Sequence, residues 1–158
     1  MVEKYEELLV AIRRVIRAID LRSKKLSKDV GITGPQLLVL QELKATPGTT
    51  AKRVADLVNL SQATVTSILD RLESKQLIKR VRSETDRRQV ALHLTDEGAV
   101  TLESAPRSME DSFIERFNQL EEWEQSLLLS SVQRVASMMD ANELDAAPIL
   151  NIGDLTSK

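Results

Sequence analysis

The sequence predicts a mainly α-helical protein that carries one small β-hairpin. Apolar residues recur at the three- and four-residue spacing of amphipathic helices through most of the 158 residues. Two short segments, 77–82 and 90–94, instead alternate apolar and polar residues, as paired strands do. Aromatic residues make up only 3% of the chain, so the core must consist mostly of Leu, Val, Ile and Ala.

Two helices are expected before residue 48. The first spaces its apolar residues helically from Leu8 to Leu26 and ends at Gly31, because glycine readily adopts the left-handed conformation that closes a helix. The second begins after Thr33, a good N-cap, with Gln36 at the position that a capping box requires. The Thr-Pro-Gly segment at 46–48 ends this helix in a turn.

Two further helices follow, joined by a tight turn. Thr50 is expected to cap a short helix over residues 51–58, whose predicted inward-facing residues are Val54, Leu57 and Val58. Asn59 and Leu60 form the turn, and asparagine tolerates the left-handed conformation that such a turn can require. Ser61 caps the next helix, which runs to about residue 75, with a buried stripe of Val65, Ile68, Leu69 and Leu72.

The hairpin and two helical stretches complete the chain. The alternating segments are joined by a polar loop at 83–88, and a new helix begins at Thr95. This helix should kink or break at Pro106, because proline cannot donate the backbone hydrogen bond of a helix interior. A final helix is expected over residues 121–139, and the tail at 142–158 reads as a loop.

Several classes of function are excluded or unsupported by composition. The chain has no cysteine and a single histidine, His93, so disulfides, thiol chemistry and histidine-rich metal sites are ruled out, whereas an all-carboxylate metal site is not. His93, on a strand, is expected to be structural. No nucleophile or phosphate-loop motif is present, so we expect neither an enzyme nor a cofactor. The lack of a long apolar run or signal peptide predicts a cytoplasmic protein that contacts no membrane.

Charge is distributed unevenly along the chain. Residues 51–88 contain nine Lys and Arg against five Asp and Glu, a local charge of +4, whereas residues 101–158 carry four against eleven, a charge of −7. A nucleic-acid-binding protein needs a basic surface where it binds and not a basic chain as a whole. The basic region coincides with the short helix, the turn, the following helix and the hairpin.

That order of elements is a winged helix-turn-helix, and it predicts binding to double-stranded DNA. The helix after Ser61 would bury one face and offer the other to a major groove, and its free face carries small and polar side chains that allow close approach. Arginines on the hairpin loop suit a narrow minor groove, and other cations could hold phosphates. The predicted contacts are Lys52, Arg53, Ser61, Gln62, Ala63, Thr64, Thr66, Ser67, Arg71, Lys79, Arg82, Arg87 and Arg88.

Two stretches of the chain resemble the MarR family of transcriptional regulators. The wing matches that family's D-x-R-x5-L-T-x-x-G pattern from Asp86 to Gly98, and residues 60–73 resemble its recognition helix. The resemblance implies a homodimer, with residues 1–31 and 96–141 as the dimerisation region, 32–95 as the DNA-binding domain and 142–158 as a tail. It also implies that Arg87 enters the minor groove, and that Arg88 pairs with Asp86 or Asp70 to hold the wing to the helix, although the two arginines could exchange roles.

The resemblance extends to a subgroup that represses compatible-solute (ectoine-type) biosynthesis genes. Segments 15–20 and 123–128 carry this likeness, which implies control of osmotic-stress genes. The trigger stays open between a small organic ligand and ionic strength acting on phosphate contacts. A winged-helix module that binds protein instead of DNA is the alternative, and it predicts weak, unselective binding to any duplex.

Overall fold

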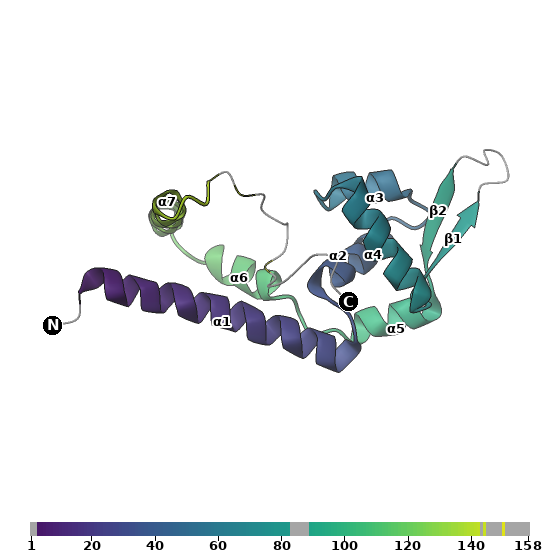
Figure 1. Ribbon diagram of the computed structural model, residues 1–158, viewed down its shortest axis with the longest axis horizontal. Coiled ribbons are helices and arrows are strands. Elements are labelled where there is room, and N and C mark those ends of the chain that lie inside the picture. Colours follow the sequence, from purple (N-terminus) through teal and green to yellow (C-terminus); the bar gives the residue numbers. More distant parts are fainter. Residues whose placement is uncertain (1–2, 83–88, 143, 145–149, 151–158) are drawn as a thin grey trace. The chain divides into compact units, whose positions relative to one another are not determined.

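A computed structural model describes residues 3–82, 89–142, 144 and 150, and it divides the chain into two compact units. The first unit, up to Pro106, holds α1 (Lys4–Val30), α2 (Gly34–Ala45), α3 (Ala51–Leu57), α4 (Gln62–Ser74), the strands β1 (Ile78–Arg82) and β2 (Val90–Leu94), and α5 (Asp96–Ser104) (Figure 1). The second, Arg107–Ala147, holds α6 (Met109–Phe117) and α7 (Glu122–Met138). The predicted mainly helical fold with one hairpin is confirmed.

The helix boundaries lie where local capping chemistry puts them. Gly31 ends α1 in a left-handed conformation with φ of 71°, and the Thr33 and Gln36 side chains form the predicted capping box of α2. Thr50 caps α3 and Ser61 caps α4, each by accepting a hydrogen bond from a backbone N–H three residues on. Asn59, in the turn between α3 and α4, has a φ of 50°, as expected.

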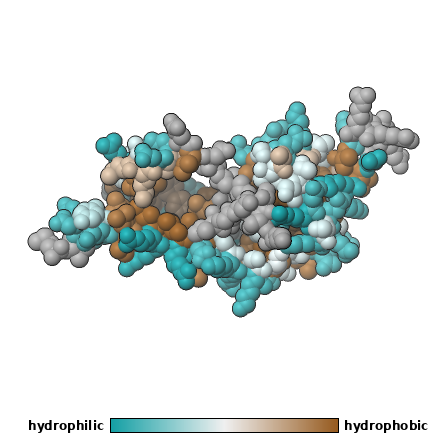
Figure 2. All heavy atoms as spheres, in the orientation of Figure 1, coloured by the Kyte–Doolittle hydropathy of each residue, from teal (hydrophilic) through white to brown (hydrophobic). Residues whose placement is uncertain are grey.

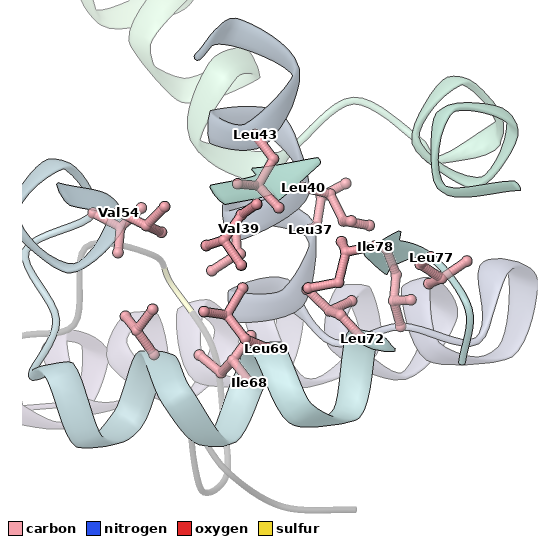
Figure 3. Close-up of a cluster of buried hydrophobic side chains, with 14 of the residues drawn as sticks. Leu37, Val39, Leu40, Leu43, Val54, Ile68, Leu69, Leu72, Leu77 and Ile78 are labelled. Atoms are coloured by element: carbon pink, nitrogen blue, oxygen red, sulfur yellow. The ribbon is translucent and has the colours of Figure 1, made fainter. Parts of the chain in front are cut away.

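The core of the first unit lies between α2, α3, α4 and the hairpin. Figure 3 shows side chains from these elements pointing toward one another, among them Leu40 of α2, Val54 of α3 and Leu69 of α4. The predicted stripe of α4 (Val65, Ile68, Leu69 and Leu72) is fully buried. The prediction for Leu57 was wrong: its side chain is 42% exposed, and Ala55 takes the inward position in α3.

The hairpin is antiparallel and extends by one bridge beyond its two strands. Ile78 is paired with Leu94, Arg80 with Leu92 and Arg82 with Val90. On the other side of β2, Thr49 from the loop before α3 bridges to Leu92, whose N–H donates to the Thr49 carbonyl at 2.8 Å. The hairpin is therefore bound through the middle of β2 to the loop that leads into α3.

Thr95 and Gly98 join the hairpin to α5 and to the end of α4. The Thr95 hydroxyl donates to the Gln76 carbonyl at 2.7 Å and accepts from the Gly98 N–H at 3.0 Å, while the Thr95 N–H donates to the Leu77 carbonyl. A Cβ at Gly98 would overlap that Leu77 carbonyl and would lie 2.8 Å from Leu94 Cδ1. Helix α5, which the sequence grouped with the C-terminal helices, packs here against α2 and the core.

Lys75 connects α4 to α1. Its backbone closes the C-terminus of α4, and its ammonium group donates to the Gly31 carbonyl oxygen at 2.6 Å. A cation at the carboxyl end of a helix interacts favourably with the helix dipole, and Lys75 lies at two such ends. The C-terminal end of α1 is thereby attached to the C-terminal end of α4.

The predicted helix break at Pro106, the last residue of the first unit before Arg107, is confirmed. Helix α5 ends at Ser104, and α6 begins after the N-cap Ser108. Phe113 and Phe117 stack within α6, with ring centroids 5.5 Å apart. Among the described residues, none of the helices combines the length and the apolar character needed to cross a bilayer.

Candidate nucleic-acid interface

Helix α4 turns one polar face away from the core. Gln62, Ala63 and Thr66 in its first turns are exposed, and Thr64, Ser67 and Arg71 lie half-buried on its flank. The helix carries no charged residue from Gln62 to Leu69. A face of short, uncharged side chains can approach base edges in a major groove closely.

The hydroxyl groups of this face are largely used within the helix itself. The Ser61 Oγ accepts from the Thr64 N–H at 3.1 Å and lies 2.8 Å from the Thr64 hydroxyl. The Thr66 hydroxyl donates to the Gln62 carbonyl oxygen at 2.8 Å. The sequence predicted Ser61 as an N-cap and Thr64 and Thr66 as DNA contacts, and the structure gives the hydroxyl of each an internal partner.

Arg80 of β1 binds two carboxylates of α4. Its guanidinium lies 2.7 Å from the Asp70 carboxylate and 2.6 Å from that of Glu73. Partial burial lowers the pKa of Arg80, but its bonds to Asp70 and Glu73 outweigh this effect, so the pKa rises above its ordinary value and the group stays cationic. The cluster fastens the strand that leads into the wing to the exposed side of α4.

Sequence reasoning did not assign this role to Arg80. It predicted that Arg88 pairs with Asp86 or Asp70 to hold the wing to the helix. Arg88 and Asp86 lie outside the described residues, and among those described it is Arg80 that binds Asp70. The sequence did contain a signal for this ion pair. Asp70 and Glu73 lie three residues apart and therefore share a helix face, where a cation would neutralise their neighbouring negative charges.

The candidate phosphate-binding cations lie on two elements. Lys52 and Arg53 are exposed in the first turn of α3, directly after its N-cap. Lys79 and Arg82 are exposed on β1, but side chains alternate along a strand, so these two lie on opposite faces of the hairpin. The same alternation puts Arg82 on the face of Arg80 and Ile78. Asp86, Arg87 and Arg88 lie outside the described residues.

Neither His93 nor the carboxylates form a metal centre in the described part of the chain. Among the residues that the structure describes, there is no group of three or more Asp, Glu or His side chains placed to hold a metal ion. His93 is half-buried on β2, and its ring lies beside Gly48. This position fits a packing role for His93.

Known proteins resemble this chain over the elements just described. The family model "MarR family" matches residues 32–90. The transcriptional regulator MgrA of Staphylococcus aureus, of the helix-turn-helix type, is 43% identical over 74 residues, which cover 47% of this chain and 50% of MgrA. The chain thus matches about half the length of this curated relative.

Two solved structures share the fold over most of the chain. The PcaV transcriptional regulator from Streptomyces coelicolor, in complex with its natural ligand, is 29% identical with a TM-score of 0.56, covering 88% of this chain and 98% of PcaV. A point mutant of S. aureus MepR bound to an oligodeoxyribonucleotide is 25% identical with a TM-score of 0.51, covering 87% of this chain and 99% of MepR.

Proposed function

We propose that this chain, which the MarR family model matches over residues 32–90, is a repressor that binds a near-palindromic operator as a homodimer. The exposed, uncharged face of α4 carries the proposal, because it lies beside a wing strand that Arg80 fixes in place. A relative bound to an oligodeoxyribonucleotide supports the same reading. The protein would act in the cytoplasm by blocking polymerase.

The proposed contacts follow from the positions of the side chains. Gln62, with its amide exposed at the start of α4, would pair with adenine, and Arg71 would reach guanine or phosphate from the flank of the helix. Phosphates would be held by Lys52 and Arg53 at the start of α3, and by Lys79 and Arg82 on the hairpin. For the wing loop, the proposal keeps Arg87 as the minor-groove arginine.

Exposed apolar side chains support the proposed dimer. Helix α7 exposes large side chains along its length, including Trp123 at 66% and Val132 at 66%, and α1 exposes Leu8, Val15 and Ile16. Figure 2 shows brown apolar side chains at the surface over α1 and α6, whereas the surface of α3 and α4 is mainly teal and pale. Apolar surface of this extent is usually covered by a partner. Two reading helices would then enter successive major grooves about 34–36 Å apart.

The signal that relieves repression would be a ligand or a change in ionic strength. PcaV, with its natural ligand, provides a precedent for a ligand-binding relative. Ionic strength acts on phosphate contacts directly, because each contact releases counterions. The likeness of segments 15–20 and 123–128 to the compatible-solute repressors favours osmotic-stress genes as targets.

The proposal is tested by titrating the full chain against labelled duplexes. Fragments from upstream of its own gene and of the neighbouring genes are compared with random duplex by fluorescence anisotropy over a series of salt concentrations. Specific binding should exceed random binding by about a thousandfold or more on one fragment. Equal and weak binding to every fragment at low salt would contradict the proposal and favour a protein-binding module.

A further inference from the structure

We infer that α4 reads thymine in the major groove through methyl groups, with Thr66 as the residue that determines this specificity. The inference rests on the proposed function, since it concerns the bases that the same helix would select. It follows from the geometry of the exposed face of α4, where the threonine hydroxyl groups already form hydrogen bonds within the protein.

Thr66 has its hydroxyl hydrogen committed to the helix. The hydroxyl donates to the Gln62 carbonyl at 2.8 Å, so the oxygen is held against the backbone. Threonine has one other heavy atom beyond Cβ, its γ-methyl group, and the residue is exposed. Thr66 therefore has no hydroxyl hydrogen left to donate to a base, and its γ-methyl group is the apolar part of the side chain that can contact one.

Ala63 adds a second methyl group to the same surface. It is exposed and lies three residues before Thr66, a spacing that puts both on one side of the helix. Thr64 adds little polar character to this surface, because its hydroxyl lies 2.8 Å from that of Ser61 in a hydrogen bond and the residue is half-buried. The surface between Gln62 and Thr66 is thus apolar at its centre.

Thymine is the base that complements such a surface. Its C5 methyl group projects into the major groove, and side chains such as Ala and the Thr methyl contact it favourably. Burying a methyl-sized group from water changes affinity about fourfold. Uracil pairs with adenine as thymine does but lacks this methyl group, so thymine-to-uracil replacement isolates the contact.

The test uses the full chain and an operator selected from random duplex. Each thymine of one half-site is replaced by deoxyuridine in turn, and the dissociation constant is measured by anisotropy. At least one replacement should weaken binding about fourfold. Thr66→Val, which keeps a methyl group, should retain this sensitivity to uracil. Thr66→Ser, which keeps the hydroxyl, should lose it. Thermal melts establish that both variants are folded.

The outcomes separate this inference from the proposed function. Selective binding that changes less than about twofold at every uracil position overturns methyl reading while leaving the operator intact. Sensitivity that survives in Thr66→Ser and disappears in Thr66→Val overturns it as well, because the hydroxyl would then be the reading group. If no sequence is selected at all, the proposed function fails and the inference fails with it.

Discussion

Replacing Gly98 by alanine tests whether close packing or helix propensity decides this position of α5. In an exposed helix, alanine is more favourable than glycine by up to about 1 kcal/mol. Here the new Cβ would overlap the Leu77 carbonyl oxygen and lie 2.8 Å from Leu94 Cδ1. The overlapped atom belongs to the backbone and also accepts the Thr95 N–H, so it cannot turn aside as a side chain could.

The expected result is a net loss of stability. Overpacking of this kind costs about 1–3 kcal/mol, and we expect Gly98→Ala to lower the free energy of unfolding by about 2 kcal/mol. For a chain of this length, that loss corresponds to a decrease in Tm of about 4–8 °C. The measurement is urea denaturation followed by circular dichroism, at one protein concentration, because the stability of a dimer depends on concentration.

Val100→Ala is the matched control in the same helix. Val100 is 62% exposed, so its truncation should change stability by less than about 0.5 kcal/mol. A Gly98→Ala variant that is as stable as the unaltered protein, or more stable, would refute the packing argument and leave helix propensity as the dominant effect.

Three further expectations concern the interface and the dimer. Arg80→Met should weaken DNA binding at least several-fold in anisotropy titrations. It should lower the free energy of unfolding by less than about 1 kcal/mol, because the ion pairs of Arg80 are partly exposed. Undiminished affinity would contradict the role given to Arg80. Lys52→Ala should weaken binding to all sequences alike and reduce the salt slope by about one; an unchanged slope would remove Lys52 from the phosphate contacts. Leu127→Asp should give a monomer in sedimentation, since this exposed apolar residue lies on the proposed interface; a persistent dimer would place the interface elsewhere.

The sequence predicted those parts of the fold that depend on neighbours along the chain. N-caps such as Thr33 and Ser61, and the left-handed Asn59, act within three or four residues, so the local pattern contains the whole interaction. The buried stripe of α4 was also readable, because three helical turns define one apolar side clearly. In α3, seven residues form barely two turns, and the pattern could not decide between Leu57 and Ala55 as the inward residue.

Interactions between separate helices and strands could not be predicted from the local sequence. Arg80 finds Asp70 ten residues away, across the end of a helix and the start of a strand, and many cations in this region could have been that partner. The internal hydrogen bonds of the Thr64 and Thr66 hydroxyls were missed for a different reason. Their residue types were read correctly, but the hydrogen bond that each makes depends on its rotamer, which a sequence does not specify.

The ion pairs of Arg80 also reduce the negative charge that α4 would present to a DNA backbone. The 60% exposed side chain of Asp70 lies directly after the uncharged stretch that ends at Leu69, and a bare carboxylate there would repel phosphates within the Debye length of about 8 Å. Arg80 leaves Asp70 and Glu73 with one net negative charge in place of two. The wing strand thus supplies a built-in counterion for the helix, and this counterion, unlike an ion from solution, is not diluted or exchanged when the salt concentration changes.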